Sequence, residues 1–183
     1  MNSKKIKVVI TLLSVLLLTV FVAGGTLAWL STETEPIENQ FSPGAVNVQI
    51  EETFNGTVKK NVTVTNTGST AAYVRVKLVT YRVNADGQNI GGMAEIPAFT
   101  LGDGWFESNG IYYYKAPVEP GKQPKTPLIG DTGIQLTTYT DANGGKQQID
   151  VIAEAIQAEP AGAVEAAWDD VTVAANGSIS MKE

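Results

Sequence analysis

The sequence contains neither cysteine nor histidine among its 183 residues. The lack of cysteine excludes disulfides, and with them the zinc and redox motifs that depend on this residue. The lack of histidine removes the commonest metal ligand, the usual general base, and every Ser-His or Cys-His nucleophile pair. Enzymes whose mechanism depends on cysteine or histidine are therefore excluded before any motif is considered.

Basic residues are scarce outside the N-terminus. Three of the 13 basic residues, Lys4, Lys5 and Lys7, lie in the first 28 positions, where there is no acidic residue. The other ten stand against all 19 acidic residues, which gives the rest of the chain a net charge of −9. Because nucleic-acid binding needs basic surface facing phosphates, we expect no nucleic-acid partner.

Recognisable catalytic and cofactor motifs are also missing. There is no Gly-x-Ser-x-Gly elbow, no phosphate-cradling glycine loop and no EF-hand. The carboxylate pairs Glu51-Glu52 and Asp169-Asp170 are adjacent, so on a strand their members point to opposite faces and suit a solvated surface. We expect no catalytic residue, no metal site and no cofactor. An enzyme that uses only Asp, Glu, Ser, Lys or Tyr is the least favoured alternative.

A long apolar run is the first feature that is present. After the three N-terminal lysines, the 23 residues from Val8 to Leu30 carry no charge. This length fits either a long signal peptide or a membrane-spanning helix. Gly24 and Gly25 weaken a helix near its end, which favours an extended cleavage region.

The residues after the two glycines favour cleavage. Thr26 and Ala28 form the small-x-small pattern that signal peptidases accept, and cleavage after Ala28 leaves Trp29 as the new N-terminus. The alternative is an uncleaved anchor with Trp29 at the membrane interface, where tryptophan is favoured. We predict a signal peptide over residues 1–28 and a secreted protein, found in the extracellular matrix or at the cell surface. It contacts the membrane only if the N-terminus stays uncleaved.

The rest of the chain predicts short strands separated by turns. Apolar and polar residues alternate along several segments, as they do in half-buried strands. The expected strands cover residues 46–50, 58–66, 72–83, 105–106, 111–114 and 132–140. We predict that 58–66 and 72–83 form an antiparallel hairpin across the turn "TNTGST" (65–70).

The last third of the chain is less regular. Segment 149–160 carries apolar residues on both faces, which predicts a central, buried strand, and 160–168 predicts a short helix. The fold class expected is all-β: a β-sandwich or jelly-roll of antiparallel strands with one or two short helices. The organisation expected is a signal peptide (1–28), an N-terminal arm (29–42) and the β-domain (43–183).

One aromatic cluster is a candidate ligand surface. Trp105, Tyr112, Tyr113 and Tyr114 lie on the two strands expected on either side of the turn "ESNG", and sugars stack on such rings. The same residues also suit core and cross-strand packing. Because three successive tyrosines cannot all face inward, at least one is expected to reach solvent.

Several segments resemble a known family. These are the junction "GGTLAWLS", the segment "NQFSPGAVNVQIEE", the hairpin "KKNVTVTNTGSTAAYVRVKL", and the later "WFESNGIYYYKAPVEPGKQPKTPL" and "IDVIAEAIQAEPAGAVEAAW". Over nearly the whole chain the sequence resembles the SipW-dependent exported proteins of Gram-positive bacteria, the TasA/CalY (camelysin-like) family, and in particular its clostridial-type members.

The resemblance implies a structural role. It implies a jelly-roll subunit that a dedicated signal peptidase trims and that assembles, with itself and with related proteins, into fibres of the biofilm matrix. The mature N-terminal arm would add a strand to the neighbouring subunit, with Trp29, Leu30, Ile37 and Phe41 as its apolar anchors. Some relatives are called proteases, but a chain with no histidine gives that activity no chemical support.

The arm departs from a good strand sequence. Glu33, Glu35, Pro36 and Glu38 disfavour a continuous strand, so the inserted part is short or lies elsewhere. The sequence therefore predicts a secreted fibre subunit that assembles by strand exchange. The alternative is a surface adhesin or carbohydrate-binding module that uses the aromatic cluster.

Overall fold

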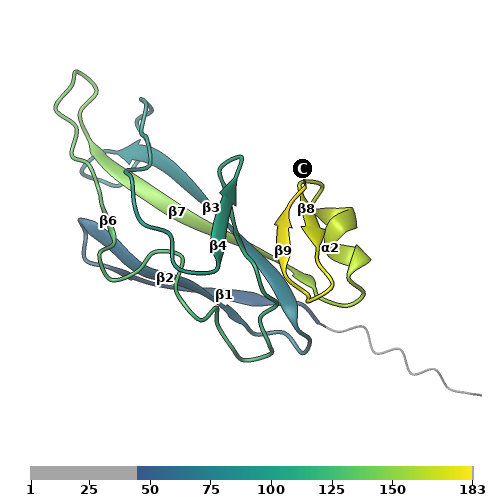
Figure 1. Ribbon diagram of the computed structural model, residues 1–183. Helices are drawn as coiled ribbons and strands as arrows, with labels where there is room; N and C mark the ends of the chain where they lie inside the picture. The colour runs from purple at the N-terminus through teal and green to yellow at the C-terminus, as the bar shows by residue number, and fades with distance from the viewer. Residues whose placement is uncertain (1–44, 183) are drawn as a thin grey trace, which may run out of the picture. The chain divides into compact units, whose positions relative to one another are not determined.

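The computed structural model describes residues 45–182. These residues form antiparallel β-sheets and one short helix, so the protein is an all-β protein as the sequence predicts (Figure 1). The predicted signal peptide, the cleavage residues Thr26, Ala28 and Trp29, and the arm at 29–42 lie outside the described residues. Within the described part, no helix is both long and apolar enough to cross a membrane.

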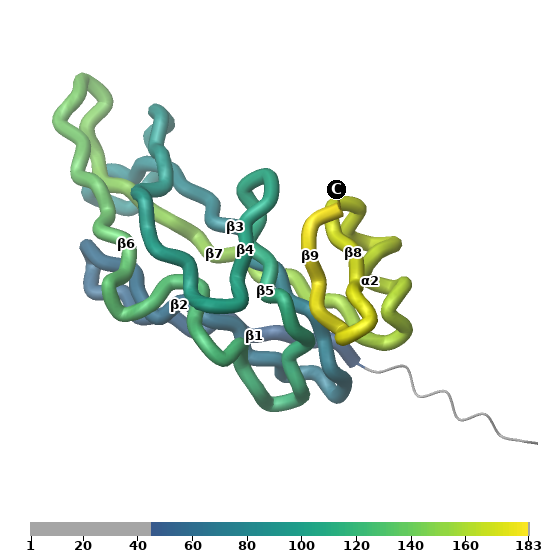
Figure 2. The backbone as a smooth tube through the Cα atoms, in the orientation of Figure 1, coloured from purple at the N-terminus to yellow at the C-terminus, as the bar shows by residue number. Residues whose placement is uncertain are grey.

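The first sheet contains β1 (Val48–Phe54), β2 (Val58–Asn66) and β6 (Ile134–Gln135), in the order β1-β2-β6. Isolated bridges extend it, because Val62 of β2 pairs with Ile129, and Ile129 pairs in turn with Leu101. Figure 2 follows the long connection between β5 and β6, which supplies this pairing before it enters β6.

The second sheet contains β3 (Ala72–Val83), β4 (Trp105–Ser108), β5 (Ile111–Tyr114) and β7 (Lys146–Gln157), in the order β4-β5-β3-β7. Strands β3 and β7 are paired along all 12 residues of each, and Figure 1 shows them as two long neighbouring strands. The hairpin of β4 and β5 agrees with the strands predicted on either side of "ESNG".

One hydrophobic cluster joins the two sheets. It is built from alternate residues of the long strands, because successive side chains of a strand point to opposite faces. Each such side chain stabilises the fold by about 1.5–3 kcal/mol when fully buried. Its β-strand members are Val62, Val64, Val74, Val76, Leu78, Trp105, Tyr114, Ile134 and Ile149.

The predicted hairpin of 58–66 and 72–83 is wrong, although both strand ranges are correct. β2 pairs with β1 and β6, whereas β3 pairs with β5 and β7, so the turn between β2 and β3 crosses from one sheet to the other. Asn66 stabilises this crossing, because its side-chain amide donates to the carbonyls of Thr70 (2.8 Å) and Val118 (2.7 Å). Alternation along a strand does not reveal which strand will pair with it.

The prediction for 149–160 is half correct. The segment is a strand, β7, but it lies at the edge of its sheet and pairs only with β3. The predicted strand at 132–140 is also shorter than expected, since only Ile134–Gln135 forms β6.

A small second unit follows β7. It contains α2 (Gly162–Ala167), β8 (Val171–Val173) and β9 (Ile179–Met181), which lie together beyond the C-terminal end of β7, in yellow-green to yellow in Figure 1. This C-terminal unit packs on the second sheet through its own hydrophobic cluster, which includes Tyr73, Tyr113, Val164, Trp168 and Ile179. The helix agrees with the prediction for 160–168.

Candidate functional site

The outer edge of β7 is open over its middle. The backbone of Ala72 in β3 bonds to Val118 on the side away from β7, and pairing alternates along antiparallel strands. Ala72 lies opposite Gln157 of β7, so Gln157 also directs its backbone groups away from β3. By alternation, the other odd-numbered residues of β7 do the same. The N–H of Gln147 follows this rule, since it donates to the carbonyl of Thr137. The next four odd residues have no backbone partner within residues 45–182: Ile149, Val151, Ala153 and Ala155.

Strand β1 has an open edge of the same kind. The carbonyl of Asn47 accepts from Thr67 and Gly68, on the β2 side. By the same alternation, Val48 and Ile50 direct their backbone groups away from β2. Within the described chain these groups also have no backbone partner. Unpaired strand edges are templates for another strand.

The two open edges lie side by side, with a groove of about 600 Å³ between them. One wall carries Ile50, Glu52 and Lys59 of the first sheet. The other carries residues 148–152 of β7 and Val79 of β3. The exposed side chain of Ile152, with 47% of its surface accessible, adds apolar area beside the groove. This site could not be found from the sequence, because strand ranges do not say which strands end a sheet.

A bulge in β2 turns a lysine into this groove. Glu51 lies opposite Thr63 and Thr53 lies opposite Lys60, so β2 has one residue more than β1 between these pairs. Asn61 takes up the extra residue with a φ of 54°, a conformation that asparagine tolerates better than most residues. The insertion changes which side chains face inward, and Lys59 lies on the core side opposite buried Ile134.

Lys59 forms one ion pair, but not all of its hydrogen-bond donors are used. Lys59 is 3% exposed, and its Nζ lies 2.6 Å from Oε1 of Glu52. The ammonium carries three donors, and this carboxylate is its one hydrogen-bond acceptor within the described residues. The ring of Phe54 also lies 5.5 Å from Nζ. A buried charge is stabilised only when it is paired and its hydrogen bonds are made.

The aromatic residues of the predicted ligand surface are mostly buried. Trp105 and Tyr114 are 5% and 6% exposed and pack together in the main core, with ring centroids 5.3 Å apart. Tyr112 is half-buried and packs on Phe99. Tyr113 points away from the main core, as alternation requires, but the C-terminal unit covers it completely. The hairpin therefore does not present a row of exposed rings.

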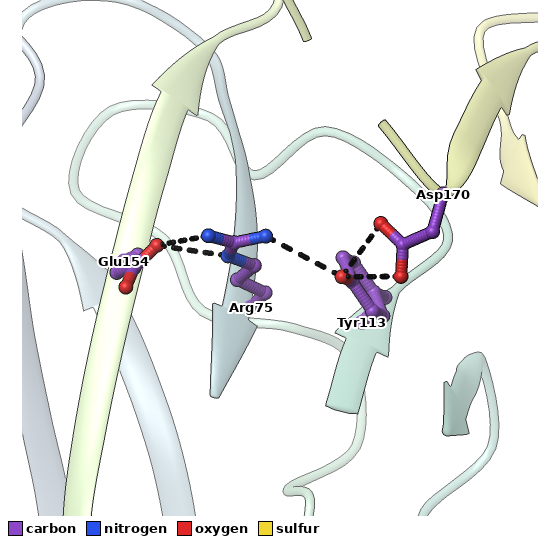
Figure 3. Close-up of polar contacts among 4 residues, drawn as sticks. All are labelled: Arg75, Tyr113, Glu154 and Asp170. Atoms are coloured by element: carbon purple, nitrogen blue, oxygen red, sulfur yellow. Dashed lines mark hydrogen bonds and ion pairs between the residues drawn. The ribbon is translucent and has the colours of Figure 1, made fainter. Parts of the chain in front are cut away.

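A polar network holds the C-terminal unit on the second sheet (Figure 3). The hydroxyl of Tyr113 donates to the carboxylate of Asp170, at 2.9 and 2.8 Å from its two oxygens. Arg75 donates to this hydroxyl (3.4 Å) and to Glu154 of β7 (2.6 and 2.8 Å), and its guanidinium lies 4.8 Å from the ring of Trp168. Because every member is engaged with its neighbours, the arrangement suits a structural clamp better than a reactive site.

Substitution of Tyr113 by phenylalanine tests this clamp. Burial, and then the hydrogen bond to Asp170, raise the pKa of Tyr113. The unfolded chain therefore ionises first, so this contribution to stability is complete below about pH 10 and is lost as pH rises toward the native pKa. We expect Tyr113→Phe to lower the free energy of unfolding by about 1–3 kcal/mol near neutral pH. It should also make the loss of stability at alkaline pH shallower. Urea unfolding at neutral pH and above about pH 10 measures both effects. An unchanged alkaline slope would contradict this role.

No cluster of three or more acidic residues within 45–182 is arranged to hold a metal ion. The adjacent carboxylates act separately, since Glu51 accepts from Thr65 while Glu52 pairs with Lys59. Comparison of the chain with protein-family models, curated proteins and solved structures gave no match.

Proposed function

We propose that this protein is a secreted structural subunit of an extracellular fibre, of the kind that forms a biofilm matrix. Its β-domain is a jelly-roll in which the open edges of β1 and β7 can take an additional strand. The N-terminal arm of a neighbouring subunit, within residues 29–41, supplies this strand. Repetition of the contact in one direction builds a filament, because a head-to-tail contact that does not close continues indefinitely.

The observation that carries this proposal is the pair of open edges. Ile149, Val151, Ala153 and Ala155 on one side and Val48 and Ile50 on the other offer backbone groups to an added strand. Neighbouring strands in a sheet lie about 4.8 Å apart, and added strands gain affinity from main-chain hydrogen bonds and specificity from side-chain pockets. The groove between the edges provides such a pocket.

The extent of the open edge also agrees with a short insert. The outer edge of β7 is already paired at its first residues, because Thr138 of the preceding segment forms a bridge with Lys146. The open stretch from Ile149 to Ala155 therefore spans seven residues, or about 23 Å at 3.3 Å per residue. An arm that Pro36 interrupts can still supply a strand of this length on its N-terminal side.

The proposal is tested by electron microscopy of two purified chains. One begins at Trp29, and the other lacks residues 29–41. We expect fibres from the first and monomers from the second, because only the first carries the added strand. Both hydrophobic clusters are built from residues after the arm, so the truncated chain keeps its core.

A full-length control separates the arm's sequence from its length. A chain in which Trp29, Leu30, Ile37 and Phe41 are replaced by serine keeps the arm but loses its apolar anchors. It should remain monomeric, as should the truncated chain. Monomers from the chain that begins at Trp29, even at high concentration, would refute assembly through the arm.

A further inference from the structure

We propose that Asn55, in the turn between β1 and β2, is a self-modifying site. The backbone nitrogen of Gly56 attacks the side-chain amide of Asn55 and converts this residue to aspartate or isoaspartate. Both products add a negative charge to the turn, and isoaspartate also lengthens its main chain by one carbon. The inference is independent of the proposed function, because it uses this turn alone.

The reaction balances with water as its one co-reactant. The nitrogen of Gly56 loses its proton to solvent base and forms a bond to Cγ of Asn55, which places a negative charge on Oδ1. The Cγ–Nδ2 bond then breaks, and Nδ2 takes up a proton and leaves as ammonia. Water opens the resulting five-membered succinimide at either of its two carbonyls. The rate therefore depends on a free glycine N–H and on donors that stabilise charge on Oδ1.

Three hydrogen-bond donors converge on Oδ1 of Asn55. The N–H groups of Thr57 and Val58 lie 3.0 and 2.7 Å from this oxygen, and the hydroxyl of Thr57 lies 3.1 Å from it. Donors at such distances stabilise the oxyanions of acyl-transfer intermediates in enzymes. Because Oδ1 stays in the succinimide, these bonds need not break during the reaction.

The attacking nitrogen is free. The N–H of Gly56 donates no hydrogen bond within residues 45–182. The turn is exposed, and apart from the chain neighbours of Gly56 no heavy atom lies within 4 Å of the point where its Cβ would stand. A glycine also lacks the side chain that would restrict this approach. Both requirements of the reaction are therefore met in one turn.

The other three Asn-Gly pairs of the sequence provide internal comparisons, at Asn109, Asn143 and Asn176. In each pair the glycine N–H already has an acceptor: Gly110 donates to the carboxylate of Glu107 (2.5 Å), Gly144 to that of Asp141 (3.0 Å), and Gly177 to the carbonyl of Ala174 (2.8 Å). Each of these bonds must break before the nitrogen can attack. A carboxylate beside the nitrogen also opposes the loss of its proton.

Peptide mapping of the purified protein tests the assignment. The protein is incubated at mildly alkaline pH, and the conversion of all four asparagines is followed by mass spectrometry. We expect Asn55 to react several-fold faster than each of the other three. Thr57→Val should slow it by about two- to tenfold, because one donor is lost while the shape of the side chain is kept. In the chain denatured with guanidinium, the four rates should converge and Thr57→Val should have little effect.

Two further variants separate the nucleophile from the donors. Glu107→Ala frees the N–H of Gly110, so it should speed the reaction of Asn109 several-fold and leave Asn55 unchanged. Ser178→Ala removes a hydroxyl that donates to Oδ1 of Asn176 (2.7 Å), the counterpart of Thr57→Val. It should have little effect, because the N–H of Gly177 is held by another bond.

The outcomes are distinct. Fast conversion at Asn55 that is slowed by Thr57→Val supports the proposal. A folded protein in which Asn55 reacts no faster than the other three overturns it, since the bonds to Oδ1 would then hold the amide away from Gly56. An unchanged rate in Thr57→Val overturns it as well.

Discussion

Substitution of Ala153 by proline is expected to abolish fibre assembly while leaving the subunit folded. Ala153 lies in the middle of β7, and its N–H faces the open edge, away from the ladder with β3. Proline has no N–H, so in the isolated subunit this change removes no hydrogen bond within residues 45–182. It does remove a donor that an added strand would use, and proline is accepted on strand edges of this kind. Assembly is measured by electron microscopy and sedimentation, and folding by thermal unfolding.

The neighbouring residue provides the matched control. Ile152 lies opposite Lys77 and directs its backbone groups toward β3, so Ile152→Pro breaks the ladder inside the subunit. We expect it to lower the free energy of unfolding by about 1–3 kcal/mol, whereas Ala153→Pro should have a smaller effect. Normal fibres from Ala153→Pro would show that β7 is not the edge that receives the arm.

Substitution of Trp168 by alanine is expected to cause the largest loss of stability. Trp168 is 4% exposed, contacts the ring of Tyr113 edge-on with centroids 5.7 Å apart, and lies against the guanidinium of Arg75. Truncation of a buried tryptophan costs about 3–5 kcal/mol, and here it also removes the cation–π contact. Urea unfolding followed by circular dichroism measures the change in the free energy of unfolding.

An exposed residue of the same unit serves as the comparison. Met181 of β9 is 47% exposed, so Met181→Ala should change the free energy of unfolding by about 0.5 kcal/mol or less. Trp168→Phe should fall between the two, because a smaller ring still covers Tyr113. Equal effects of Trp168→Ala and Met181→Ala would mean that the C-terminal unit contributes little to the stability of the sheet beneath it.

The two predictions probe separate parts of the molecule. Trp168 anchors the C-terminal unit on the outer side of the second sheet, whereas Ala153 lies on the open edge beside the groove. We therefore expect Trp168→Ala to act mainly on stability, and Ala153→Pro mainly on assembly.

Local pattern was sufficient for much of the secondary structure. The ranges 58–66 and 72–83 agree with β2 and β3, because alternation over nine or more residues is a strong signal. The hairpin of β4 and β5 also agrees, since its turn and both strands lie within ten residues. The helix α2 agrees for the same reason, as its signal is local.

Pairing between distant strands was not available from the sequence. The turn between β2 and β3 contains the residues of a tight connection, yet it crosses between sheets because Asn66 bonds to Val118, 52 residues away. In the same way β7 has apolar residues on both faces, which predicts a central strand. Its outer face is instead partly exposed at the sheet's edge, where Ile152 reaches solvent.

The orientation of Lys59 in the groove and the burial of Tyr113 are two features that no periodicity could reveal. A one-residue bulge at Asn61 turns Lys59 inward, although a simple count along β2 would place it with Thr63, on the face opposite Val62 and Val64. The burial of Tyr113 is similar: alternation correctly points it away from the core, but a unit more than 40 residues later covers it. In both cases the side chain's surroundings come from a distant part of the chain.

The sequence by itself determined the all-β class, the positions of the long strands and the absence of histidine and cysteine chemistry, because composition and period-two alternation are local properties. Only the tertiary structure decided which strands pair, which edges stay open and which way Lys59 and Tyr113 face. Strand partners meet through hydrogen bonds between backbone groups that are the same in every residue, so their choice rests on the packing of the whole core.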